Sequence, residues 1–190
     1  MDPIAALAAG RPVLLPTDTV YGLCSAPGEV AARALYELKG RAQAQPTALL
    51  ATSITALLAA IPELDIDPLR KLLPGPYTLV VPNPAGRFPW LTGGEPGPIG
   101  VRVPQLPKQT DEIIEAIGIV LATSANDPGG ANPVTLDEVP RRMRDGCAAE
   151  LDLGALPGTP STVIDLTGAE PRILREGAVP AAEALRRLRA

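Results

Sequence analysis

The most informative segment of this sequence reads Pro16-Thr17-Asp18-Thr19-Val20-Tyr21-Gly22-Leu23. It follows the apolar run at residues 13–15, which is typical of a buried strand. Two hydroxyls, a carboxylate and a phenol fall within five residues, and at a strand end they can offer several hydrogen bonds to a small polar ligand. A threonine-rich turn whose hydroxyls cap the local backbone is the alternative. Polar clusters at other strand ends decide between the two interpretations.

The composition is typical of a globular protein of one domain. The chain has 190 residues, 46% hydrophobic and 20% charged, and we expect a single domain over residues 1–190. With a net charge of −4, binding to nucleic acid would need a local basic patch, and the arginines of residues 141–144 and 186–189 are better explained as solvated helix faces.

Several classes of site are excluded by residue counts. Two cysteines imply no disulfide framework, and the absence of histidine excludes a serine–histidine–aspartate triad and any histidine metal site. The chain has no P-loop and no Rossmann glycine motif. Since no apolar run reaches the length of a membrane span and the N-terminus does not read as a signal peptide, we expect a cytoplasmic protein.

Helix and strand patterns interleave along the chain. Helices are expected at residues 2–9, 29–38, 53–61, 68–73, 106–117, 136–144 and 181–189. Strands are expected at residues 13–15, 47–52, 77–81, 99–103, 119–122, 151–153, 161–165 and 172–175. A long loop rich in proline and glycine covers residues 83–98. The alternation predicts an α/β or α+β fold on one twisted, mixed sheet.

Three further polar clusters could share a pocket with the first. Lys39 and Arg41 lie beyond a helix end, where they could grip a polyphosphate or complement the helix dipole. Ser124 and Asn126 follow an apolar strand and could bind a nucleotide or a carboxylate, or form an Asx turn. Arg102 lies among apolar neighbours and would be costly to bury without an anion, unless it faces water from an edge strand.

Seven motifs follow one another along the chain at ordinary spacing. They are Pro-Thr-Asp-Thr-Val-Tyr-Gly-Leu, Leu-Tyr-Glu-Leu-Lys-Gly-Arg, Leu-Leu-Pro-Gly-Pro-Tyr-Thr-Leu, Gly-Val-Arg-Val-Pro, Thr-Ser-Ala-Asn, Pro-Ser-Thr-Val-Ile-Asp and Ile-Leu-Arg-Glu-Gly. In this order they resemble the YrdC-like family, the threonylcarbamoyl-AMP synthases, over roughly residues 10–177. The chain is similar to the short, single-domain form of that family.

The resemblance implies a fold and a reaction. The fold is a twisted, mixed sheet flanked by helices around a large concave cavity. The reaction forms threonylcarbamoyl-AMP and pyrophosphate from L-threonine, bicarbonate and ATP, for the N6-threonylcarbamoyl modification of adenosine 37 in tRNA (t6A). ATP is a substrate, and Mg²⁺ is expected without a dedicated protein ligand. tRNA and the downstream threonylcarbamoyl-transferase proteins are candidate partners, and no membrane is expected.

The resemblance also assigns residues to roles. The expected catalytic residues are Lys39, Arg41, Ser124 and Asn126. The expected L-threonine contacts are Thr17, Thr19, Tyr21, Arg102, Ser124 and Ser161. The expected ATP contacts are Lys39, Arg41, Gln45, Asn126 and Arg175.

The chain departs from the family pattern at three ligand positions. Leu50 stands where a histidine is usual, Pro98 where a serine or threonine is usual, and Val134 where a threonine is usual. Two alternatives stay open beside the synthase. One is a non-catalytic tRNA- or RNA-binding module, against which the acidic composition argues. The other is a related enzyme that forms a carbamoyl-adenylate from carbamoyl phosphate.

Overall fold

In the computed structural model, which describes residues 1–40, 47–92 and 97–190, nine strands form one mixed sheet in the order β7-β1-β2-β6-β3-β5-β4-β8-β9. The strands are β1 (Val13–Pro16), β2 (Tyr21–Ser25), β3 (Ala48–Ala51), β4 (Tyr77–Val81), β5 (Ile99–Arg102), β6 (Ile119–Ser124), β7 (Ala149–Glu150), β8 (Thr162–Asp165) and β9 (Arg172–Arg175). Three neighbouring pairs, β1–β7, β3–β5 and β4–β8, are parallel, and the others are antiparallel. The predicted mixed α/β sheet is confirmed.

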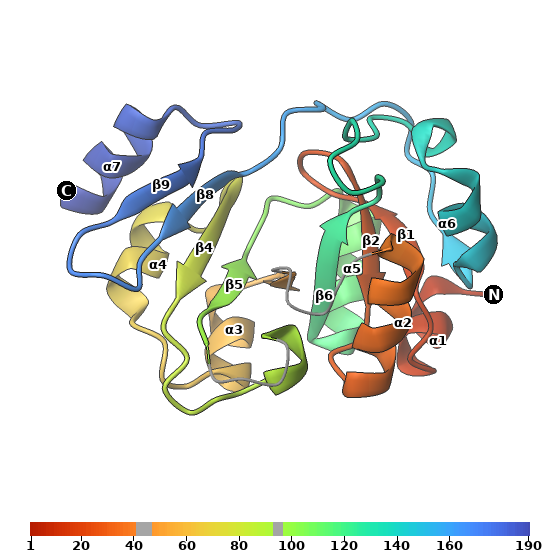
Figure 1. Ribbon diagram of the computed structural model, residues 1–190, viewed down its shortest axis with the longest axis horizontal. Coiled ribbons are helices and arrows are strands. Elements are labelled where there is room, and N and C mark those ends of the chain that lie inside the picture. The colour runs from red at the N-terminus through yellow and green to blue at the C-terminus, as the bar shows by residue number, and fades with distance from the viewer. Residues whose placement is uncertain (41–46, 93–96) are drawn as a thin grey trace.

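Helices cover both faces of the sheet. They are α1 (Pro3–Ala8), α2 (Glu29–Lys39), α3 (Ile54–Ala60), α4 (Ile66–Leu72), α5 (Lys108–Ile117), α6 (Arg141–Gly146) and α7 (Ala181–Arg189), with 3₁₀ turns η1 (Pro89–Leu91) and η2 (Leu136–Glu138). Figure 1 shows α2 in front of β1 and β2 and α5 behind them. In the described ranges, no helix combines the length and the apolar character needed to cross a membrane.

Strand β1 shows why the sheet is buried on both sides. Leu14 belongs to the apolar cluster that includes α2, whereas Val13 and Leu15 belong to the cluster that includes α1 and α5. All three side chains are fully buried. Burial of one such side chain stabilises the folded state by about 1.5–3 kcal/mol. The three buried side chains therefore hold β1 firmly between the two helical layers.

Three parts of the structure differ from the sequence expectation. Residues 21–25 form a strand, β2, which was not predicted; it pairs with β1 in a hairpin closed by Pro16 and Tyr21. The helix expected at residues 136–144 is interrupted at Val139 and Pro140, because proline has no N–H to continue the helical hydrogen bonds. The strand expected at residues 151–153 is instead β7, two residues earlier, beside β1.

Candidate active site

A cavity of about 550 Å³ lies along the middle of the sheet, and residues of β2 to β6, β8 and β9 line it together with the β1–β2 turn. It brings together six of the residues predicted to bind substrate. They are Thr17, Thr19, Arg102, Ser124, Ser161 and Arg175. These residues come from distant parts of the sequence, so the fold, not the local chain, assembles the group.

Small side chains provide the space for this cavity. Ala122 of β6 pairs with Ala48 of β3, Ala48 pairs with Gly100 of β5, and Gly100 pairs with Val80 of β4. All four residues line the cavity. A Cβ added at Gly100 would lie 3.5 Å from Ala48, so the strands already touch at this row. Larger residues here would fill the floor of the cavity, which explains why this register carries alanine and glycine.

The β1–β2 turn forms one wall. The Thr17 hydroxyl donates to the Val20 carbonyl at 2.7 Å, and it lies 3.2 Å from the Thr19 hydroxyl. The Thr17 hydroxyl therefore caps the local backbone, as the alternative interpretation predicted, and both threonines also line the cavity. The two interpretations of this segment are compatible.

Arg102 lies beside this wall at the end of β5, a strand in the interior of the sheet. Its Nη2 donates to Asp18 Oδ1 at 2.8 Å, and the side chains are only 11% and 8% exposed. The expectation that a buried arginine needs an anionic partner is confirmed, and the edge-strand alternative is wrong for Arg102.

Arg175 and Ser161 form the opposite wall. The Arg175 guanidinium donates to the Ser161 carbonyl at 2.8 Å and to its hydroxyl at 3.2 Å. The Ser161 hydroxyl lies 2.7 Å from that of Thr78. Burial, followed by the nearby positive charge of Arg102, lowers the pKa of Arg175 from its ordinary value. The cavity thus holds two guanidinium groups, those of Arg102 and Arg175.

Lys39 lies behind Ser124 and is fully buried. Its Nζ donates to the Ser124 carbonyl at 2.5 Å, to Asn126 Oδ1 at 2.6 Å and to the Asn126 carbonyl. The Ser124 hydroxyl donates to the same Asn126 Oδ1 at 2.6 Å. These three predicted residues therefore form one network, in which only Ser124 lines the cavity among the described residues. Arg41 and Gln45, which were predicted to bind ATP, lie outside the described residues.

The Tyr21 hydroxyl contacts the segment at residues 152–154. The hydroxyl lies 2.9 Å from both Asp152 Oδ1 and the Gly154 carbonyl, and it accepts the Leu153 N–H. Burial raises the pKa of this phenol. Tyr21 is not one of the described residues that line the cavity. The contact of Tyr21 with an amino acid stays a prediction, and its position favours a bracing role.

The three departures from the family pattern lie away from the cavity lining within the described ranges. Leu50 is fully buried in the apolar cluster shared with α1 and α5. Pro98 is exposed, and Val134 is half-buried beside Gly158. None of the three therefore removes a side chain from the cavity wall as the structure describes it.

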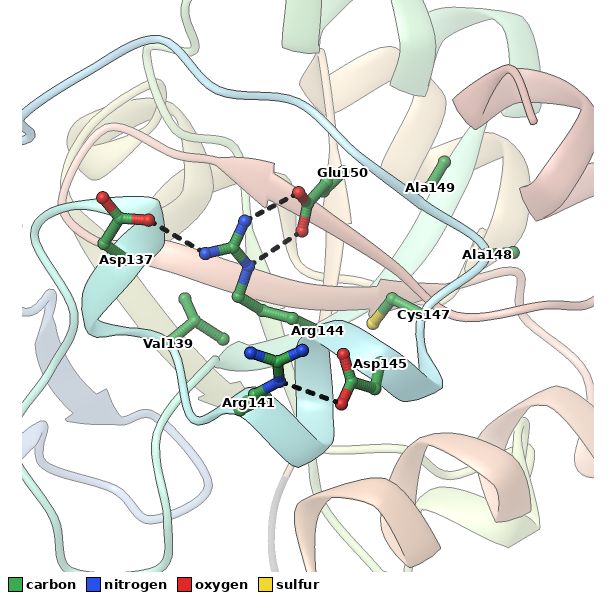
Figure 2. Close-up of a pocket in the computed structure, with 9 residues that line it drawn as sticks. All are labelled: Asp137, Val139, Arg141, Arg144, Asp145, Cys147, Ala148, Ala149 and Glu150. Atoms are coloured by element: carbon green, nitrogen blue, oxygen red, sulfur yellow. Dashed lines mark hydrogen bonds and ion pairs between the residues drawn. The ribbon is translucent and has the colours of Figure 1, made fainter.

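A second cavity, of about 570 Å³, lies beside α6 and β7 (Figure 2). Arg144 donates to both oxygens of Glu150 at 2.9 and 3.1 Å and to Asp137 at 2.9 Å, and Arg141 lies 3.5 Å from Asp145. Burial raises the pKa of the Cys147 thiol to about 12, so this thiol stays protonated. Because each guanidinium in Figure 2 already faces a carboxylate, this cavity is less suited to an anion than the first.

Metal ligands are not evident in either place. Over residues 1–40, 47–92 and 97–190, no cluster of three or more histidine, cysteine, aspartate or glutamate side chains could hold a metal ion.

The first cavity defines a class of protein. Hydroxyls and an ion pair on one wall, a second guanidinium opposite, and a buried lysine behind a serine are suited to binding a small ligand that carries negative charge. The chain belongs to the Sua5/YciO/YrdC family, whose model, described as "Telomere recombination", matches residues 5–177.

The curated relatives of this chain are named threonylcarbamoyl-AMP synthase. A Mycobacterium tuberculosis (strain ATCC 25618 / H37Rv) protein with the provisional name threonylcarbamoyl-AMP synthase is 35% identical over 181 residues, covering 93% of this chain and 82% of that protein. The Homo sapiens threonylcarbamoyl-AMP synthase is 33% identical, covering 86% of this chain and 61% of that protein. The crystal structure of Pyrococcus abyssi Sua5 complexed with L-threonine superposes with a TM-score of 0.87 at 30% identity, covering 97% of this chain. This chain spans 55% of the length of that chain.

Proposed function

We propose that this protein is an L-threonylcarbamoyladenylate synthase, a nucleotidyltransferase that forms threonylcarbamoyl-AMP and pyrophosphate from L-threonine, bicarbonate and ATP for the t6A modification of tRNA. The observation that carries the proposal is the cavity, because it gathers hydroxyls, Arg102 and Arg175 in a chain whose relatives are named for this reaction. As parts of the same proposal, residues 1–190 act as one domain, and the reaction takes place in the cytoplasm. tRNA and the threonylcarbamoyl-transferase proteins act downstream.

The amino acid binds at the wall formed by the β1–β2 turn. Arg102 supplies a guanidinium for the threonine carboxylate, and Thr17 and Thr19 supply hydroxyls for its polar groups. Ser161 closes this end together with Arg175. Tyr21 supports this end through its bond to the segment at residues 152–154.

ATP binds at the side of Lys39 and Ser124. The Lys39 ammonium donates to oxygens of Ser124 and Asn126, which places its positive charge behind Ser124, where it favours a phosphate. Arg175 adds a second cation, and Arg41 and Gln45 are assigned here by the family resemblance alone. Mg²⁺, when bound with ATP, neutralises part of the phosphate charge and is held by the phosphates and water.

The chemistry requires orientation more than a protein nucleophile. The neutral threonine amine and bicarbonate condense to a carbamate with loss of one water molecule, and a carbamate oxygen then attacks the α-phosphorus while the bond to pyrophosphate breaks. The Lys39 and Arg175 charges stabilise the negative charge that develops on the phosphate oxygens. Cys24 takes no part as a nucleophile, because burial raises its pKa to about 12.

Pyrophosphate release tests this proposal. The protein is expected to release pyrophosphate only when ATP, L-threonine and bicarbonate are all present, and each omission is the control. No pyrophosphate at any concentration of threonine and bicarbonate would overturn the proposal. Release with carbamoyl phosphate in place of threonine and bicarbonate would identify the carbamoyl-adenylate enzyme instead.

A further inference from the structure

Asp18 is the one acidic residue in the segment at residues 16–23, and it pairs with Arg102 at 2.8 Å. Strands β6 and β3 separate β5 from the β1–β2 hairpin in the sheet. The pair therefore ties the turn to a strand that is not its neighbour. The Asp18 and Arg102 side chains are 8% and 11% exposed, so the charges are largely removed from water.

The pairing is incomplete. Arginine and a carboxylate can form two parallel hydrogen bonds. Here Asp18 Oδ1 accepts from Arg102 Nη2 and from the Thr19 hydroxyl at 3.3 Å. Asp18 Oδ2 and Arg102 Nε are buried and have no hydrogen-bond partner in the described structure. Arg102 lines the cavity, whereas Asp18 is not among the described lining residues, so Asp18 acts on the cavity through Arg102.

The charges that line the cavity indicate which kind of ligand the Asp18–Arg102 pair favours. Arg102 and Arg175 both line the cavity, and Arg175 donates hydrogen bonds to the neutral oxygens of Ser161. Asp18 supplies the negative charge that balances Arg102. A zwitterionic amino acid offers a carboxylate to the guanidinium and an ammonium group that the nearby carboxylate favours. A free inorganic anion offers only negative charge, which Asp18 disfavours.

We propose that Asp18 is a positioning residue and counter-ion for Arg102, and that it makes the amino-acid end of the cavity select a zwitterion over small free anions such as inorganic phosphate. The proposal rests on the proposed function, because it assigns the amino-acid end to this wall. It adds a specificity role for a residue that was not expected to act on the ligand.

The test uses Asp18→Asn in the full chain. Without the counter-ion, Arg102 is an uncompensated cation, so the inhibition constant of inorganic phosphate, measured in competition with L-threonine, is expected to fall by about fivefold or more. The KM for threonine is expected to rise by about fivefold while the KM for ATP stays within about twofold. Asp18→Glu, which keeps the charge, is expected to restore phosphate inhibition to near the parent value.

Asp165→Asn is the matched control. The Asp165 side chain is also 8% exposed and also pairs with an arginine, Arg172, at 2.6 Å, but it is not among the described residues that line the cavity. This variant is expected to leave the phosphate inhibition and both KM values unchanged. A parallel change in the control and in Asp18→Asn would overturn the proposal, since loss of any buried aspartate that pairs with an arginine would then suffice, although Arg172 is itself 73% exposed.

If Asp18→Asn does not fold, a double variant provides the test. Asp18→Asn with Arg102→Gln removes both buried charges together, which avoids leaving one of them unpaired. The strong phosphate inhibition is expected to be absent there, because residue 102 no longer supplies a guanidinium at the amino-acid end. Strong inhibition in the double variant, or unchanged inhibition in Asp18→Asn, would contradict the role of Asp18.

The proposed function and the role of Asp18 can be tested separately. If the parent protein releases no pyrophosphate, that proposal fails, and calorimetric titration of inorganic phosphate into the parent and the Asp18 variants tests the counter-ion role by itself. Tighter phosphate binding to Asp18→Asn alone supports the role, and equal binding to all variants overturns it.

Discussion

At the scale of single residues, Lys39 differs from the residues of the core because it is a fully buried lysine. A buried ammonium group is costly unless hydrogen bonds compensate it. Lys39 meets this requirement with carbonyl and amide oxygens of Ser124 and Asn126. These oxygens hold the ammonium group in place behind Ser124. A core position would tolerate a neutral residue, so the charge points to a function in binding an anion.

Replacing Lys39 by methionine tests this interpretation. The variant keeps the length of the side chain but removes the charge, so kcat/KM for pyrophosphate release is expected to fall on the order of a hundredfold or more. Lys71→Met is the control, because the exposed Lys71 ammonium donates to the Leu188 carbonyl at the surface and is not among the described residues that line the cavity. Retained activity in a folded Lys39→Met protein would contradict the assignment.

Thr19 tests which substrate the β1–β2 turn contacts. Thr19→Val removes the hydroxyl that lies between Thr17 and Asp18. The KM for L-threonine is expected to rise by about tenfold, with a much smaller change for ATP, since a lost hydrogen bond to a charged group is worth about 1.5–3 kcal/mol. Thr110→Val is the matched control, because this buried hydroxyl donates to the Pro16 carbonyl outside the cavity. The reverse pattern, with ATP more affected, would reject the orientation.

The sequence indicated that some residues need a partner, but it did not identify which residue that partner is. Arg102 was expected to need an anion, but only the fold shows that Asp18 supplies it. The arginines at residues 141–144 were interpreted as a solvated face. Arg141 and Arg142 are exposed as expected, but the contacts of Arg142 with the Leu38 carbonyl and Asp127 and the pair of Arg144 with Glu150 were not foreseen. Ion pairs between distant segments depend on tertiary packing, which periodicity does not report.

At the scale of elements, the β8–β9 hairpin depends on one carboxylate. Asp165 at the end of β8 accepts from Arg172 at the start of β9, and also from the backbone and hydroxyl of Thr167. The hydrogen bond from Arg172, followed by those from Thr167, lowers the pKa of Asp165 from 3.8 to about 2. Asp165 therefore links the ionisation of one group to the stability of the sheet edge.

The stability of this hairpin is expected to depend on pH in a defined window. Because the folded-state pKa lies below the unfolded one, the carboxylate contributes stability that is present above about pH 4 and is lost as pH falls toward 2. Asp165→Asn is expected to be less stable than the parent at pH 6, and the difference should shrink by pH 2. Urea unfolding across this range measures it. A difference that is independent of pH would contradict the ion-pair explanation.

Tyr21 braces strand β2 against the segment at residues 152–154. Tyr21→Phe removes the hydroxyl, so the free energy of unfolding is expected to fall by about 1 kcal/mol or more, with little change in the KM for threonine. Denaturant unfolding and the pyrophosphate assay together check this. A raised threonine KM with unchanged stability would instead support the predicted substrate contact.

Most elements could be predicted because their hydrophobic patterns are local. The exceptions have physical causes. Strand β2 begins within the polar segment that was taken as a ligand-binding turn, and its pairing with β1 depends on the hairpin. The helix expected at residues 136–144 contains Pro140, which ends the first turn at η2 before α6 begins.

At the scale of the whole molecule, the cavity follows from the strand order. Ala122, Ala48 and Gly100 are unremarkable along the sequence, and they become one surface only because β6, β3 and β5 are neighbours. The cavity could therefore be expected from the family resemblance but not from composition or periodicity. The same order brings Arg102 and Arg175 to one space from opposite sides of β4 and β8.

Mass spectrometry of the reaction product tests the central claim most directly. With ATP, L-threonine and ¹³C-labelled bicarbonate, the protein is expected to form threonylcarbamoyl-AMP that carries the label in its carbamoyl group. The same mixture without threonine is the control. A folded protein that yields no threonylcarbamoyl-AMP, or yields an unlabelled or different adenylate, would contradict the account.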